Sequence, residues 1–307
     1  MECKIDLNEN WVDGVKLERI LSTLSVEQLS DSQIFEINIS SSTGIMIDAG
    51  VRILSYANQL TNEGKQVKID FDDDSSGAYT YLNRVGFFDF IESEIEILPR
   101  RPRFSASKRF KGNNPGVFEI VPIDPETVPI DTQLPATMTS SLLSNIADQE
   151  HKKSLDTPCF TFFAELVENI YLHSQTQLKG FVAYQAYSKG GKIKVVVSDS
   201  GVGMINSLRP SIEEFHPECK ELTDSLLIEK MFAEGLSKDG KDKGCGLYSC
   251  ARQALKFKAS IDVRLPKSVF HLTPVTKTSF GYNALGSIID SRIPFKGTHI
   301  TVDIALD

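Results

Sequence analysis

Strand and helix patterns alternate in the N-terminal part of the chain, and this alternation restricts the fold more than any other feature. The first strand pattern, IFEINI, alternates apolar and polar side chains, as a half-buried strand does. The helix pattern after it repeats apolar side chains on one face and stops at Gly64. The four patterns are strands at 34–39 and 66–71 and helices at 45–60 and 76–85. We therefore predict a small α/β domain here, built from a strand–helix–strand–helix unit.

The C-terminal half contains a similar mixture of strand and helix patterns over a longer stretch. A helix is indicated most strongly at 160–173, where apolar residues recur at positions i, i+3, i+4 and i+7. The remaining predictions are helices at 140–153, 223–235 and 247–257 and strands at 118–123, 192–197, 259–265 and 298–306. This half is therefore also predicted to have an α/β fold.

A basic, proline-rich segment separates the two halves. Residues 97–117 contain six basic side chains, three prolines and no acidic residue. Because the prolines and the Gly112–Asn114 run disfavour regular structure, we predict an exposed linker. One interpretation of its charge is a surface for nucleic acid or another anion; a solvated loop that balances an acidic body is the one we favour. The predicted division is a domain at 1–96, a linker at 97–117 and a second domain at 118–307.

Length, charge and cysteine content exclude several classes of protein. The 307 residues suffice for two domains of about 150 residues each. The net charge of −8, from 33 basic and 41 acidic side chains, argues against a nucleic-acid partner for the chain as a whole. No apolar run approaches the roughly 18 residues that a membrane span needs, and the first residues lack a secretion signal. The five cysteines form no CxxC pair, so we expect neither structural zinc nor a disulfide framework. This pattern favours a reducing environment, and we expect a cytoplasmic location.

The first motif with chemical potential is Glu165-Leu-Val-Glu168-Asn169, on the helix predicted at 160–173. Glu165 and Asn169 are separated by four positions and therefore share one face of the helix. A carboxamide oxygen can ligate Mg²⁺, and a neighbouring carboxylate can take a proton from an attacking water. By itself this pair is weak evidence, because Glu and Asn are common on exposed helix faces.

The second and third motifs are glycine-rich turns next to a strand and a helix. The strand at 192–197 runs into DSGVG at 199–203, where the glycines let a ligand approach the backbone. The aspartate of this turn can accept a hydrogen bond from an exocyclic amine such as that of adenine. The third motif, KGCGLY at 243–248, opens the helix predicted at 247–257, and free backbone N–H groups at such a position form a cradle for phosphate.

In this order the three motifs resemble the GHKL ATPase superfamily, which includes gyrase, the histidine kinases and the mismatch-repair protein MutL. The resemblance covers roughly residues 155–307 and includes a fourth element, FKGTHI at 295–300, where the family has a threonine beside the adenine. It implies an α/β sandwich with a mixed sheet and helices on one face. The implied cofactors are ATP and Mg²⁺, bound between the helices and a lid within 204–243, away from the open face of the sheet.

The resemblance assigns a role to each matching residue. Glu165 is implied as the general base, and Asn169 as the Mg²⁺ ligand within the ATP site. Asp199 is implied to bind the adenine. The other implied ATP-binding residues are Gly201 and Gly203 beneath the base, Gly244, Gly246 and Leu247 in the phosphate loop, and Thr298 on the adenine side.

The N-terminal unit resembles a STAS domain, the fold of anti-sigma-factor antagonists, over about residues 34–92. The match rests on the two strand patterns, on the segment IDAGV at 47–51 that opens a helix, and on the closing segment RVGFFDFI at 84–91. Phosphorylated members of that family carry Ser or Thr where this chain has Ala49. A phosphorylation switch at this position is therefore not expected, and Asp48 is interpreted as a helix cap.

Together the two resemblances imply a bacterial regulatory protein that binds Mg-ATP and hydrolyses it slowly, with lid closure coupled to partner binding. The spacing of Asn169 and His173 is similar to that of the anti-sigma serine kinases. An alternative interpretation is that His173 lies at the end of a helix and interacts with the helix dipole. A serine/threonine protein kinase that acts on a STAS partner is therefore the alternative, and a non-catalytic module with ATP as a structural ligand is a third. We expect a regulatory protein partner, bound through the STAS-like domain, and consider a homodimer possible.

Overall fold

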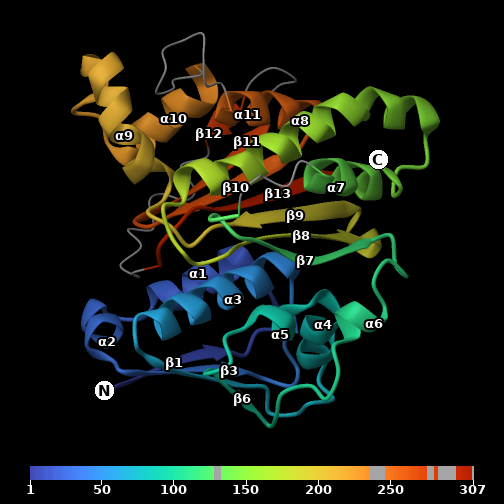
Figure 1. Cartoon of the computed structure of the whole chain (residues 1–307), viewed down its shortest axis with the longest axis vertical. Coiled ribbons are helices and arrows are strands. Elements are labelled where there is room, and N and C mark those ends of the chain that lie inside the picture. The colour runs from blue at the N-terminus through green and yellow to red at the C-terminus, as the bar shows by residue number, and fades with distance from the viewer. Residues whose placement is uncertain (128–132, 235–245, 275–279, 283–294, 306–307) are drawn as a thin grey trace.

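The computed structural model describes residues 1–127, 133–234, 246–274, 280–282 and 295–305. Its elements are stacked in four layers. Figure 1 shows them from bottom to top as a parallel sheet, a layer of helices, an antiparallel sheet and a second layer of helices. The chain is thus α/β, as its sequence predicts. Within the described ranges, no helix is both long enough and apolar enough to cross a membrane.

The parallel sheet belongs to the N-terminal half, which we define as β1 to β6, and its strand order is β1-β3-β5-β6. Its strands are β1 (Glu2–Leu7), β3 (Ile34–Ile39), β5 (Gln66–Asp70) and β6 (Glu96–Leu98). Its helices are α1 (Gly14–Ser22), α2 (Val26–Asp31), α3 (Ile47–Asn62), α4 (Gly77–Val85) and α5 (Phe87–Phe90), and two short strands, β2 (Trp11–Val12) and β4 (Gly44–Ile45), pair with each other. The strands and helices predicted at 34–86 are confirmed, and the preceding residues add β1, β2, α1 and α2.

The antiparallel sheet belongs to the C-terminal half, which we define as β7 to β13. Its strands are β7 (Val117–Ile123), β8 (Gly180–Tyr187), β9 (Lys192–Ser198), β10 (Ser260–Leu265), β11 (Ser268–Pro274), β12 (Phe280–Tyr282) and β13 (His299–Ala305). They lie in the order β12-β11-β10-β13-β9-β8-β7, and every neighbouring pair is antiparallel. The mixed sheet expected from the resemblance is therefore wrong for the described strands. Short reversals, η1 (Ser188–Gly190) between β8 and β9 and a two-residue turn between β10 and β11, impose antiparallel pairing.

Helices cover the upper face of this sheet in Figure 1. They are α7 (Gln133–Leu143), α8 (Gln149–His173), α10 (Asp224–Glu234) and α11 (Gly246–Lys256), and α9 (Met204–Phe215) with η2 (Pro217–Cys219) lies at one end of the layer. One predicted helix, at 140–153, is wrong because the chain breaks between α7 and α8. The amide of Asn145 bonds back to the carbonyls of Ser141 and Leu142, and Asp148 caps α8 by accepting from the N–H of Glu150. These side chains end one helix and begin the next.

The two faces of the antiparallel sheet differ in chemistry. On β9, Ile193, Val195 and Val197 belong to the apolar core beneath α8 and α11. Lys194 and Ser198 point to the opposite face, where they bond to α3. That face was expected to be open, but α3 covers it and is buried along most of its length. Because each sheet needs a covering layer and α3 lies between the two, both sheets share this helix.

The basic segment at 97–117 lies against α4 and α5. β6 ends inside it at Leu98, and it contains a short helix, α6 (Ala106–Arg109). The hydroxyls of Ser105 and Ser107 both donate to Asp89, at 2.8 and 2.5 Å. Arg101 donates to two backbone carbonyls of the 92–95 turn. The division of the chain into two domains and a linker stays a prediction.

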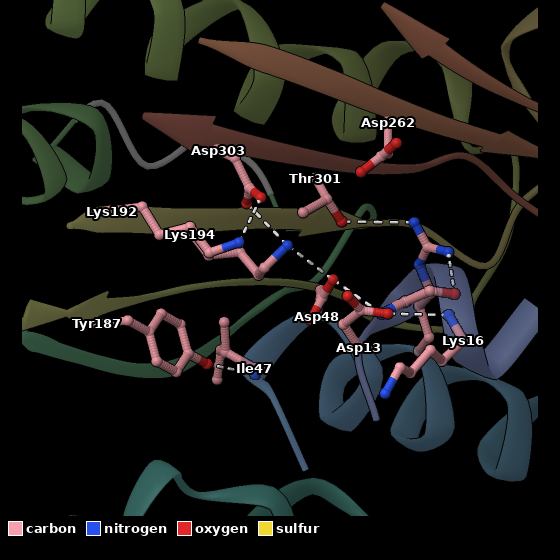
Figure 2. Close-up of polar contacts among 12 residues, drawn as sticks. Asp13, Lys16, Ile47, Asp48, Tyr187, Lys192, Lys194, Asp262, Thr301 and Asp303 are labelled. Atoms are coloured by element: carbon pink, nitrogen blue, oxygen red, sulfur yellow. Dashed lines mark hydrogen bonds and ion pairs between the residues drawn. The ribbon is translucent and has the colours of Figure 1, made fainter. Parts of the chain in front are cut away.

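A network of buried charges joins α3 to the antiparallel sheet (Figure 2). Lys194 Nζ lies 3.1 Å from a carboxylate oxygen of Asp48, at the start of α3, and 2.8 Å from one of Asp303, on β13. The same Asp48 carboxylate accepts the N–H of Gly14, the first residue of α1. Burial by itself would lower the pKa of Lys194, but the two carboxylates together raise it above its usual range. Lys194 is therefore charged, and it is the shared partner of two carboxylates from different halves of the chain.

We predict that Lys194→Met destabilises the fold by about 3–5 kcal/mol, because it leaves Asp48 without its cationic partner in the interior. Lys192→Met is the matched control. Lys192 lies two residues earlier on the same strand and bonds to the same Asp303, but its side chain is 34% exposed. Its loss is expected to change the free energy of unfolding by less than about 1 kcal/mol. Urea unfolding of both variants measures the difference, and equal losses would contradict a special role for Lys194.

Candidate functional site

Helix α8 carries Glu165 and Asn169 toward α11. Its apolar residues Phe163, Leu166, Val167 and Ile170 are buried beneath the helix, which confirms the predicted stripe. Glu165 and Asn169 lie at the edge of this stripe and are half-buried. Cys250 on α11 donates to the carbonyl of Phe162, 3.8 Å away, so the two helices are in contact one turn before Glu165.

The two polar side chains of α8 have the properties of a functional pair. Burial, and secondarily the neighbouring Glu168, raise the pKa of Glu165. A carboxylate with a raised pKa is a stronger base than an ordinary one. The amide nitrogen of Asn169 is buried and has no hydrogen-bond partner among the described residues. Such an unpaired donor is unfavourable unless a ligand or water satisfies it.

Asp199 lies directly after β9 and is buried. One of its carboxylate oxygens accepts the N–H of Gly201 at 2.8 Å, and the other accepts the N–H of Thr298 at 3.0 Å. Burial raises its pKa to about 6, although these hydrogen bonds act in the opposite direction. In the part of the chain that the structure describes, no salt bridge is seen at this carboxylate. Each of its oxygens accepts one backbone N–H and so retains a lone pair for a further donor.

Glycines allow three segments to meet around Asp199. A Cβ atom on Gly201 would lie 1.7 Å from the carbonyl oxygen of Ser174, at the end of α8. A Cβ atom on Gly297 would lie 2.0 Å from the carbonyl oxygen of Asp199, and Gly297 also has a φ of +94°. Gly203 has a φ of +82°. Larger side chains would therefore separate α8, the turn at 199–203 and the start of β13.

Hydrogen bonds then hold these segments in register. Val202 N–H donates to the carbonyl of Ser174 at 2.9 Å, and Met204 N–H donates to the hydroxyl of Thr298 at 2.8 Å. The hydroxyl of Ser174 is buried and has no partner among the described residues. The structure thus brings Asp199, Gly201 and Thr298 together at the end of the helix that carries Glu165 and Asn169.

Other predicted residues are described only in part. Gly244 lies outside the described residues, and so does the 235–243 part of the predicted lid. Gly246 and Leu247 form the first turn of α11, as expected for a helix opened by that motif. The described part of the lid contains α9 and α10.

Two contributors to the site were not selected from the sequence. Ser174 supplies the carbonyl against which Gly201 packs, and Gly297 makes the tight turn beside Asp199. The signal for Gly297 was its place directly before the candidate Thr298. Nothing in the sequence marks Ser174, because its role depends on where α8 ends in space.

Comparison of the chain with known protein families, with curated proteins and with solved structures finds no match. Among the described residues there is also no cluster of three or more His, Cys, Asp or Glu side chains that could hold a metal ion by itself. The function must therefore be argued from the arrangement of Glu165, Asn169, Asp199 and Thr298.

We predict that the Asp199 carboxyl titrates near pH 6 in the folded protein. This folded-state pKa lies above the value of about 3.9 in an unfolded chain, so the folded protein holds the extra proton between these pH values. The contribution of Asp199 to stability is therefore fully present below about pH 4 and is lost as the pH rises through about 6. Carbon-13 NMR of labelled aspartates measures the titration, and the resonance missing from Asp199→Asn assigns it. A midpoint near pH 4 would contradict the burial argument.

Proposed function

We propose that the chain binds Mg-ATP through the site around Asp199 and hydrolyses it slowly, as a regulatory protein of the GHKL class. The observation that carries this proposal is the Asp199 carboxylate, which is buried, held by the N–H groups of Gly201 and Thr298, and located at the end of α8. Each oxygen of this carboxylate accepts one backbone N–H and can accept a further donor from a ligand. The exocyclic amine of adenine is a neutral donor of the right kind.

The residues of α8 and α11 suit the phosphates. The N–H groups in the first turn of an α-helix such as α11 have no partner within the helix, and such groups favour an anion. Mg²⁺ usually takes one or two protein ligands and completes its shell with phosphate and water, so the oxygen of Asn169 and a bound triphosphate form a suitable donor set. When bound, Mg²⁺ would neutralise part of the phosphate charge. The amide nitrogen of Asn169 has no hydrogen-bond partner within the described ranges, which is consistent with a site built for a ligand.

Glu165 is the proposed general base. Its half-buried position raises its pKa and leaves it accessible to a water molecule. It would take a proton from the water that attacks the terminal phosphate. In the kinase alternative, the same carboxylate would take the proton from the hydroxyl of a protein substrate, and the products distinguish the two reactions.

The regulatory part of the proposal is the coupling of the nucleotide to a protein partner. Closure of the lid over the terminal phosphate would change the surface beside α9 and α10, which is how nucleotide switches act. A cytoplasmic partner that docks on the STAS-like half, and assembly into a homodimer, remain part of this proposal. α3 is already covered by the antiparallel sheet of the same chain. Such a partner would therefore use another surface of the N-terminal half.

We predict that Asp199→Asn weakens binding of ATP in the presence of Mg²⁺ by about 10- to 100-fold, the value of a hydrogen bond to a charged group. The matched control is Asp262→Asn on β10, because Asp262 is a buried carboxylate that pairs with His271 outside this site. The control should bind ATP as the wild type does. Isothermal titration calorimetry measures both. Absence of binding in the wild type, or equal binding by wild type and Asp199→Asn, would overturn the proposed function.

We predict that Glu165→Gln lowers the rate of ATP hydrolysis by about 10²- to 10⁴-fold while ATP binding persists, since only the proton acceptor is lost. Glu168→Gln is the control, because Glu168 lies on the same helix and is exposed. Its effect should be within about twofold. Release of inorganic phosphate measures hydrolysis. Unchanged turnover in Glu165→Gln would reduce ATP to a structural ligand, and transfer of labelled phosphate to a protein would support the kinase.

A further inference from the structure

Helix α3 of the N-terminal half contacts the same backbone segments that present Asp199 and Thr298, from the opposite side of the sheet. The amide of Gln59 forms a two-way pair with Lys296: its nitrogen donates to the Lys296 carbonyl at 3.1 Å, and its oxygen accepts the Lys296 N–H at 2.9 Å. One turn earlier, the hydroxyl of Ser55 lies 2.9 Å from that of Ser198. Lys296 precedes Thr298 by two residues, and Ser198 directly precedes Asp199.

A buried histidine connects these two contacts. Burial, with the nearby charges of Arg264 and Arg52, lowers the pKa of His299, so its ring is neutral. Nε2 lies 3.0 Å from the Lys296 carbonyl, which can only accept, so Nε2 carries the proton. Nδ1 then accepts the hydroxyl of Ser198 at 2.5 Å, and Ser198 in turn accepts the hydroxyl of Ser55.

The hydrogen bonds therefore form one directed chain. It runs from Ser55 on α3 through Ser198 on β9 and His299 on β13 to the carbonyl of Lys296, where Gln59 of α3 joins it. Four side chains take part, and all are buried: Ser55, Gln59, Ser198 and His299. Lys296 is exposed and contributes only backbone atoms. A shift of α3 would disrupt this series of hydrogen bonds, because its buried donors and acceptors would lose their partners.

Side chains alternate between the two faces of a strand, so a shift of α3 on one face also displaces the neighbouring residues that point to the other face. Ser198 and His299 point toward α3, whereas their chain neighbours Asp199 and Thr298 bond to each other on the nucleotide side. The spacing between the two strand ends is thus fixed from both faces. The Asp199–Thr298 hydrogen bond and the carboxylate position depend on that spacing.

We propose that Ser55 and Gln59 are positioning residues through which the N-terminal half sets the geometry of Asp199 and Thr298, and so controls the affinity for nucleotide. The nucleotide part of this inference rests on the function proposed above. By thermodynamic reciprocity, a ligand that orders Asp199 and Thr298 also stabilises the contact of α3 with the sheet.

The test compares Gln59→Ala with Asn58→Ala. Asn58 is the adjacent residue of α3 and makes a similar two-way amide pair, but with Phe90 and Glu92 inside the N-terminal half, at 3.0 Å each. Both variants lose two part-buried hydrogen bonds, so both should unfold at lower urea concentration. Only Gln59→Ala should loosen the site.

Two readouts make the comparison decisive. Hydrogen–deuterium exchange of the ligand-free protein follows the amides at 199–204 and 295–300, and a fluorescent ATP analogue with Mg²⁺ reports affinity. In Gln59→Ala we expect these amides to exchange at least about tenfold faster and the analogue to bind about tenfold more weakly. In Asn58→Ala both should match the wild type. Ser55→Ala, a smaller change that preserves the fold, should move both readouts in the direction of Gln59→Ala.

The outcomes separate this inference from the proposed function. Equal effects of Gln59→Ala and Asn58→Ala on exchange and affinity would show a merely structural role and overturn the inference. Unchanged exchange in Gln59→Ala and Ser55→Ala would also overturn it. Faster exchange in Gln59→Ala, in a protein whose wild type does not bind the analogue, would support the positioning role and refute the proposed nucleotide.

Discussion

The charge of Lys194, buried between α3 and the antiparallel sheet, is the interaction on which the arrangement of the two halves depends. An unpaired ammonium group in the interior is strongly unfavourable, and two carboxylates at ion-pairing distance offset this cost. One of them, Asp48, comes from the N-terminal half, and the other, Asp303, from the sheet itself. Apolar packing tolerates small displacements, but this ion triad fixes where α3 lies along the strands.

That fixed placement connects the architecture to the candidate site. The strand faces alternate, so the polar side chains that bind α3 are neighbours in sequence of those that would bind a nucleotide. Ser198 and Asp199 are the clearest pair, because one bonds to Ser55 and the other to the N–H groups of Gly201 and Thr298. Helix α3 therefore supports the site from the opposite face of the antiparallel sheet.

Local patterns were sufficient for most elements of the fold. The stripe of 160–173 predicted α8, and the alternation in IFEINI predicted β3. The helix at 140–153 was wrong because side chains at 145 and 148 cap two separate helices, which periodicity does not register. The pairing of strands also escaped prediction, because whether neighbours run parallel depends on connections rather than on any single strand. The turn at 199–203 was found from its residue types and Thr298 from the family resemblance, whereas Ser174 was not found.

The sequence by itself determined the α/β class and most helices and strands, since these follow from short-range periodicity. The set of polar and glycine residues proposed for a nucleotide site came from the family resemblance. Only the tertiary structure decided that the polar face of the sheet is covered by α3, that Gly201 packs against the end of α8, and that Gln59 pairs with Lys296. The physical reason is separation along the chain. Gln59 and Lys296 are 237 positions apart, and no local pattern encodes such a contact.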